Sequence, residues 1–177
     1  MRAFTITVLG PDRPGIVGSL SNAIAEQGGN WVESRLSKLA GHFAGILRVD
    51  IDEAALPKLT SALQGLEAEG LQIEVHPVST MPSEPLRRTL LDVEGADRSG
   101  IVKEISRAIA AHGVNVAQLD AETGAAPWSG ELLFRVRAVL EVPHSVSLET
   151  LRRSLEAIAM DLMVEAKLEE EPTDPPS

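Results

Sequence analysis

The chain has no cysteine among its 177 residues, which excludes disulfide bonds, thiolate metal sites and thiol catalysis. It also has no apolar run long enough to cross a bilayer as a helix, and its N-terminal segment is short and alternating, unlike a signal peptide. Aromatic residues are scarce at 3%, whereas 44% of the chain is hydrophobic and 24% is charged. We therefore expect a cytoplasmic globular protein that does not associate with membranes.

An excess of positive charge is also missing, and the formal net charge is −10. Residues 1–85 hold 6 basic and 10 acidic side chains, and the remainder holds 10 and 16. The only tight basic clusters are Arg87-Arg88 and Arg152-Arg153, which we interpret as decoration of solvated surfaces. Because binding to a phosphate backbone depends on clustered Lys and Arg, the sequence predicts no direct contact with nucleic acid.

Motifs of catalysis are absent. The spacing of Gly10 and Gly15 is that of a P-loop, but Ile16 follows where a P-loop needs Lys and then Ser or Thr. No Gly-x-Ser-x-Gly turn occurs, and the acid pair Asp50/Asp52 fits solvated charges at a strand end better than catalysis. The histidines lack the spacing of metal ligands; they are His42, His76, His112 and His144. We expect no catalytic residue, no metal site and no cofactor.

An internal repeat organises what is present. Residues 10–30 and residues 95–115 are identical at 12 of 21 positions without a gap. The identical pairs include Gly10/Gly95, Asp12/Asp97, Arg13/Arg98, Gly15/Gly100, Gly28/Gly113 and Asn30/Asn115. A shift of 85 residues is too long for a solenoid repeat, so the sequence predicts two copies of a small domain.

Hydrophobic periodicity gives each copy the order β-α-β-β-α-β. In the first copy, residues 4–8 alternate as a strand does, residues 16–26 have helical spacing, and Gly28 ends that helix as a residue with positive φ would. Two strands over 30–39 and 43–51, a helix over 56–66 and a strand over 71–75 follow. The second copy repeats this order, with hairpin strands expected over 114–119 and 132–142 and a closing strand over 163–168.

The pattern predicts the α+β class, with two ferredoxin-like domains that each carry two helices on one face of a four-stranded antiparallel sheet. We place the first domain at residues 1–78 and the second at 87–168. A proline-containing linker is expected over 79–86 and a disordered acidic tail over 169–177.

The loop that follows the first strand resembles the ACT domain family. The motif is Asp12-Arg-Pro-Gly-Ile, with Gly28-x-Asn30 after the helix, and the second copy departs from it only at Ser99. The resemblance spans nearly the whole chain without a catalytic domain, a format similar to the glycine cleavage system transcriptional repressor family. It implies a regulatory module that binds an amino acid.

The resemblance also implies a ligand site at the two loops, formed by the loop and the start of the second strand and shared with a neighbouring domain. The residues are Asp12, Arg13, Gly15, Asn30, Asp97, Arg98, Gly100 and Asn115. Free N–H groups at the helix start favour a carboxylate, and a carboxylate side chain accepts an ammonium group. Some serine-binding relatives carry histidine where this chain has Gly10 and Gly95, which favours a smaller ligand such as glycine.

Plainer interpretations of the same residues stay open. Asp12 can cap the helix, Arg13 can pair with a nearby acid, and Asn30 can merely tolerate a turn. On the ligand interpretation, the protein is an oligomeric sensor that changes its affinity for a protein partner such as a transcription factor. The alternative is an interaction module whose sheet faces and edges bind a partner without any ligand.

Overall fold

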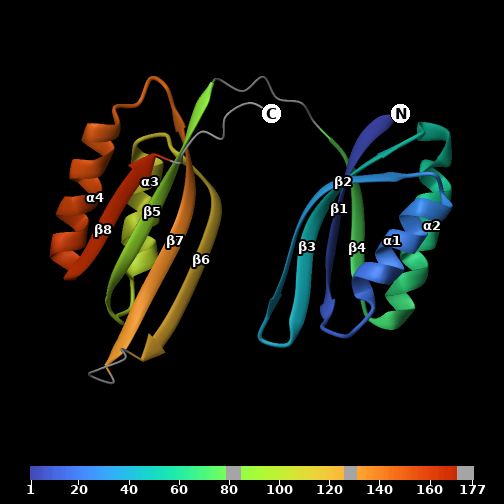
Figure 1. The fold of residues 1–177 in the computed structure, drawn as a ribbon, viewed down its shortest axis with the longest axis horizontal. Coiled ribbons are helices and arrows are strands. Elements are labelled where there is room, and N and C mark those ends of the chain that lie inside the picture. The colour runs from blue at the N-terminus through green and yellow to red at the C-terminus, as the bar shows by residue number, and fades with distance from the viewer. Residues whose placement is uncertain (79–84, 126–130, 171–177) are drawn as a thin grey trace. The chain divides into compact units, whose positions relative to one another are not determined.

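The computed structural model describes residues 1–78, 85–125 and 131–170. The chain divides into two compact units, Met1–Met81 and Pro82–Ser177 (Figure 1). Each unit is one copy of the repeat, and each has its own sheet and its own hydrophobic core.

The first unit has a four-stranded antiparallel sheet in the order β2-β3-β1-β4. Its elements are β1 (Arg2–Pro11), α1 (Ile16–Glu26), β2 (Asn30–Leu39), β3 (His42–Ile51), η1 (Glu53–Ala55), α2 (Leu56–Gly65), η2 (Leu66–Glu69) and β4 (Gln72–Pro77). Both α-helices cover the same face of the sheet (Figure 1).

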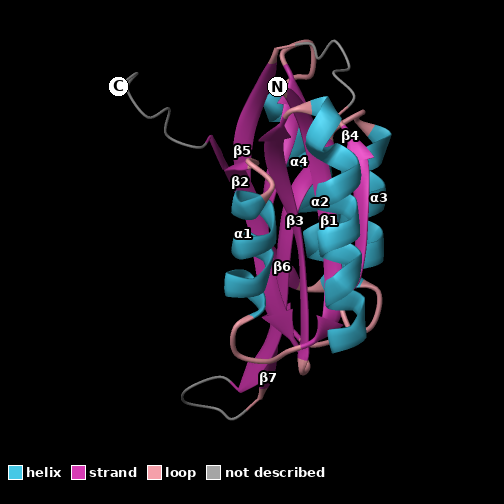
Figure 2. Ribbon diagram, turned by 90° about the vertical axis from the view of Figure 1, so that its right-hand side faces the viewer, coloured by secondary structure: helices cyan, strands magenta, loops and turns pink. Residues whose placement is uncertain are grey.

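The second unit repeats this topology with the strand order β6-β7-β5-β8. Its elements are β5 (Leu86–Ala96), α3 (Ile101–Ala111), β6 (Asn115–Ala125), β7 (Leu132–Pro143), α4 (Leu148–Leu162) and β8 (Val164–Glu170). Figure 2 looks onto the helices of the first unit and shows α1 and α2 in front of strands. The helices lie on one face of a four-stranded antiparallel sheet in each unit, which confirms the predicted ferredoxin-like class.

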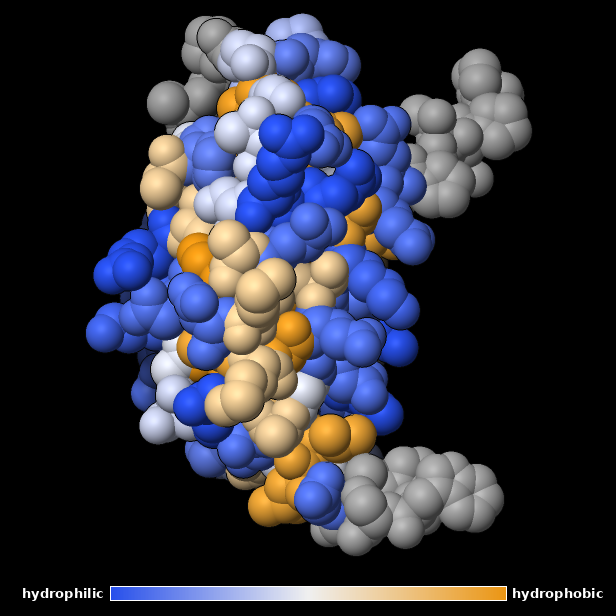
Figure 3. Space-filling view, turned by 90° about the vertical axis from the view of Figure 1, so that its left-hand side faces the viewer, coloured by the Kyte–Doolittle hydropathy of each residue, from blue (hydrophilic) through white to orange (hydrophobic). Residues whose placement is uncertain are grey.

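The core of each unit lies between its sheet and its helices. In the first unit Phe4, Ile6 and Val8 alternate inward from β1 and meet the stripe formed by Leu20 and Ile24 on α1. Such alternation and helical spacing are the patterns that the sequence shows. The side of the helix layer that faces away from the sheet is exposed to solvent. In the second unit this side displays a band of apolar residues between hydrophilic margins (Figure 3).

Several element ends depart from the sequence prediction: β1 and β4 are longer or shifted by one to three residues, β5 begins at Leu86 inside the predicted linker, and three further differences concern β6, β8 and α2. Strand β6 continues to Ala125, well past the predicted end at Leu119. The prediction stopped too early because the later residues of this strand are exposed and show no alternation of apolar and polar residues. Strand β8 begins at Val164 and runs to Glu170, so the first two residues of the predicted tail are strand. Helix α2 gives way to the 3-10 turn η2 before Gly70. The predicted linker falls largely, and the remaining tail entirely, outside the described residues.

Candidate functional site

The two glycine turns have the same backbone. Gly15 and Gly100 stand immediately before α1 and α3, with φ of 94° and 98°. Among the residues that the structure describes, no atom lies within 4 Å of a Cβ placed on either glycine, so these residues leave the space above each turn open. The first bond of each helix closes from Ser19 and Glu104 to these glycine carbonyls, which leaves the preceding N–H groups of the helix start without helical partners.

Gly10 and Gly95 are glycines for a different reason. A Cβ on Gly10 would lie 2.7 Å from the carbonyl oxygen of Gly70, and a Cβ on Gly95 would lie 2.6 Å from Cγ1 of Val164. Both positions bring the first strand of the unit into close contact with the segment that begins the last strand. A side chain at either position is therefore excluded by packing.

The aspartates of the two turns are held by their backbones in the same way. Asp12 N donates to the Gly41 carbonyl at 2.9 Å, and Asp97 N donates to the Leu132 carbonyl at 3.0 Å, so each turn is tied to its unit's hairpin. Neither aspartate caps a helix, because the N-cap residue is the glycine and no side-chain cap bond is present. The capping interpretation is wrong for both copies.

The side chains of the aspartates differ between the copies. Oδ2 of Asp12 lies 2.5 Å from Nζ of Lys38 on β2. Asp97 is exposed, and within the described part of the chain its side chain has no hydrogen-bond or ion-pair partner. One turn therefore carries a neutralised carboxylate and the other an uncompensated one.

The arginines of both turns reach the end of the second helix of their unit. Arg13 pairs with Glu69 in η2, and Nη1 of Arg98 donates to the Leu162 carbonyl at 2.8 Å. The pairing of Arg13 with an acid is the plainer alternative that the sequence left open. Both contacts link the turn to the segment that leads into the last strand.

The asparagines lie at the opposite end of each sheet from the turns. Asn30 is level with Asp50 on β3, which faces Ala3 at the start of β1, whereas the glycine turn follows Pro11 at the end of that strand. The eight residue steps from Ala3 to Pro11 span about 26 Å. Asn115 has the same position, and its Nδ2 donates to Oε2 of Glu141 at 2.8 Å. A single domain therefore does not bring its asparagine to its own turn.

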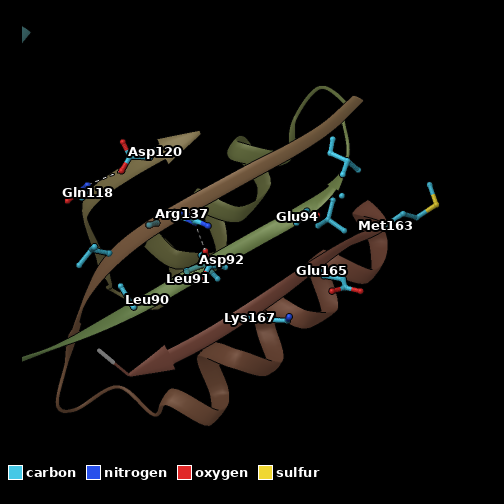
Figure 4. A pocket seen from close by; sticks show the side chains of 15 residues that line it. Leu90, Leu91, Asp92, Glu94, Gln118, Asp120, Arg137, Met163, Glu165 and Lys167 are labelled. Atoms are coloured by element: carbon cyan, nitrogen blue, oxygen red, sulfur yellow. Dashed lines mark hydrogen bonds and ion pairs between the residues drawn. The ribbon is translucent and has the colours of Figure 1, made fainter. Parts of the chain in front are cut away.

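A hollow of about 1040 Å³ lies on the open face of the second sheet (Figure 4). Two ion pairs across β5 and β7 contribute to its polar lining: Nε of Arg137 lies 3.3 Å from Oδ1 of Asp92, and Oε2 of the lining residue Glu94 lies 2.7 Å from Nε of Arg135. The other polar residues of the lining are Gln118, Asp120, Glu165 and Lys167. The hydrogen bond from Arg135 holds the pKa of Glu94 below its usual value. Because the charges of Asp92 and Glu94 are already paired with arginines at the surface, the hollow fits a solvated sheet face better than a binding site.

These features fit a known class. Models of the ACT domain family match residues 2–76 and 87–160, and the chain belongs to this family as a tandem pair of ACT domains. It is a regulatory ACT-domain protein related to the glycine cleavage system transcriptional repressor of Escherichia coli K12. The two are 25% identical over 166 residues, which cover 92% of this chain and 87% of the repressor. The two ACT domains of this chain, together with its kinship to a transcriptional repressor, point to a regulatory protein rather than an enzyme.

Solved structures agree on the fold. A protein of unknown function from Galdieria sulphuraria is 32% identical, covers 96% of this chain and 98% of its own, and has a TM-score of 0.83. A structure provisionally named as a glycine cleavage system transcriptional repressor is 21% identical, covers 94% of this chain and 95% of its own, and has a TM-score of 0.70. Within the described residues, no helix is both long and apolar enough to span a membrane.

Four contact partners of the predicted site residues were not predicted from the sequence: Lys38, Glu69 and Leu162 at the turns, and Glu141 beside Asn115. Of these partners, only Lys38 could have been noticed in the sequence, because aligning the two copies shows a lysine at position 38 and a threonine at the matching position 123. The other contacts depend on where helix and strand ends meet in space.

Proposed function

We propose that this protein senses a small amino acid, with glycine favoured, and that the bound ligand modulates a protein partner such as a regulator of transcription. The observation that carries the proposal is the duplicated turn: a glycine with positive φ, open space above it and a carboxylate side chain beside it. In each turn the free N–H groups of the helix start suit the carboxylate of the ligand, and the aspartate suits its ammonium group.

The asparagines enter this proposal through a neighbouring ACT domain. Because Asn30 lies about 26 Å along the sheet from the turn of its own unit, it can contact a ligand only at the turn of another domain. The same holds for Asn115. A neighbouring domain that runs antiparallel would bring such an asparagine to the turn, which makes self-association part of the proposal.

The close packing around the first glycine of each motif favours a ligand that has no side-chain hydroxyl group. Gly10 and Gly95 stand two residues before the aspartates, and a Cβ at either position would clash with backbone atoms. No side chain from these positions can therefore contact a ligand hydroxyl group. Glycine has five heavy atoms, and a ceiling of about −1.5 kcal/mol per atom limits its binding to about −7.5 kcal/mol, or micromolar affinity at best.

Regulation requires that the ligand and the partner bind with coupled free energies. Such coupling typically amounts to about 1–3 kcal/mol and is reciprocal, so the partner changes ligand affinity by the same factor. A thermal-shift screen of the full chain against the amino acids tests the proposal. A stabilisation by glycine that grows with concentration supports it, and no shift with any amino acid at millimolar concentration contradicts it.

The interaction module without a ligand is supported by a separate observation. The arginines of both turns are engaged in contacts within their own unit, as is Asp12, so much of the turn chemistry serves the fold. Exposed apolar residues such as Leu9 and Ile46 on the open face of the first sheet would then provide the contact surface. This module would bind its partner equally well with and without added amino acids.

A further inference from the structure

The two turns differ in charge at one structurally equivalent position. Lys38 faces Phe43 across β2 and β3, and Thr123 faces Phe134 across β6 and β7. Those phenylalanines face Gly10 and Gly95 in turn. Lys38 and Thr123 therefore occupy the same place relative to the glycine turn of their units.

The difference between Lys38 and Thr123 decides whether the aspartate of the turn has a cation beside it. In the first unit Nζ of Lys38 lies 2.5 Å from Oδ2 of Asp12, and the Asp12 side chain is only 25% exposed. In the second unit a threonine hydroxyl replaces the ammonium group, and Asp97 is exposed with no side-chain partner in the described ranges. The arginine beside it does not compensate, because Arg98 donates to the Leu162 carbonyl.

We infer that the two turns are not equivalent and that the amino group of the ligand is bound by Asp97, whereas Asp12 is occupied by an ammonium group of the protein itself. This inference rests on the proposed function and narrows it to one preferred turn per chain. The ligand class is a small zwitterionic α-amino acid. Its ammonium group must displace Lys38 at the first turn, but it meets an unpaired carboxylate at the second.

Two reciprocal substitutions, Thr123→Lys and Lys38→Thr, test the inference. The measurement is isothermal titration calorimetry, in which the full chain is titrated with glycine. We expect the wild-type chain to bind glycine at two turns of unequal affinity, with the second turn the tighter one. Thr123→Lys places an ammonium group beside Asp97 and is expected to weaken binding at that turn by up to about fivefold, the ratio that a surface ion pair at the upper end of its usual strength gives. Lys38→Thr releases Asp12 and is expected to tighten binding at the first turn by the same factor, so that the two affinities become equal.

Neutral substitutions separate charge from bulk. Thr123→Gln adds length without charge and is expected to leave affinity within a factor of two of the wild type. Two equivalent glycine sites in the wild type, unchanged by either exchange, would overturn the inference and leave the proposed function standing. Absence of glycine binding by the wild-type chain would overturn both. Equal weakening by Thr123→Gln and Thr123→Lys would also overturn the inference, because bulk rather than charge would then explain the loss.

Discussion

Gly95 and Val164 pack against each other so closely that a single methyl group cannot be added between them. A Cβ on Gly95 would lie 2.6 Å from Cγ1 and 2.9 Å from Cα of Val164. The two residues face each other in the β5–β8 pairing, where Val164 is the first residue of β8 and directly follows Met163, the C-cap of α4. The first glycine of the repeated motif is therefore required by strand packing in this unit.

Gly95→Ala is accordingly expected to destabilise the protein by about 1–3 kcal/mol, because the new methyl group forces backbone and side chain apart. Gly124→Ala is the control, since Gly124 lies in β6 and no described atom lies within 4 Å of a Cβ added there. Urea denaturation followed by circular dichroism measures both. Equal stability of the two variants would contradict the packing explanation.

The second glycine of the motif is required by backbone conformation. Gly100 has φ of 98°, and Gly100→Ala is expected to cost about 1–2 kcal/mol because an L-residue is strained there. Gly18→Ala is expected to have the opposite effect on stability. Gly18 lies inside α1 with open space around it, and the alanine is expected to stabilise the protein by about 0.5–1 kcal/mol. Thermal denaturation of both variants gives the comparison. A stabilised Gly100→Ala would show that the turn relaxes out of positive φ.

Arg98 is expected to contribute to stability through the carbonyl of Leu162. Arg98→Met removes the donor of that 2.8 Å hydrogen bond and is expected to cost about 1 kcal/mol, the usual net value of an exposed bond. Arg98→Lys keeps the charge near the carboxyl end of α4 and is expected to lose less. Denaturant midpoints rank the three proteins, and identical midpoints would remove the structural role of this residue.

The pair formed by Glu94 and Arg135 gives a pH dependence of known sign. Because Arg135 lowers the pKa of Glu94, the folded state binds this proton less readily than the unfolded state. The stabilising contribution is present above the usual carboxyl pKa of about 4.3 and is lost as the pH falls through the lowered value. In Arg135→Gln the pKa of Glu94 is expected to rise, which a carbon-13 carboxyl titration measures. An unchanged titration of Glu94 would mean that the two side chains do not pair in solution.

The fold followed from the sequence because its signals are local and repeated. Alternation in β1, helical spacing in α1 and the positive φ of Gly28 are each readable within a dozen residues, and the second copy repeats them. The outer end of β6 was not readable, because an edge strand exposed on both faces carries no alternation.

The turns themselves were predicted, but most of their partners were not. Arg13 and Glu69 are 56 residues apart, and Arg98 and Leu162 are 64 apart, so only the folded chain brings them together. The separation of Asn30 from Asp12, in contrast, could have been predicted from the order of the elements. It follows from the strand directions of a β-α-β-β-α-β unit, in which the helix returns the chain to the starting end of the first strand.

The most direct test of the central claim is a calorimetric titration of the full chain with glycine, beside the Asp12→Ala/Asp97→Ala double variant. The proposal predicts saturable binding at micromolar or weaker affinity by the wild type. It predicts no binding by the double variant, whose circular dichroism spectrum stays native because neither aspartate caps a helix. Binding of glycine with undiminished affinity by a folded double variant would contradict the assignment of the ligand site to these turns.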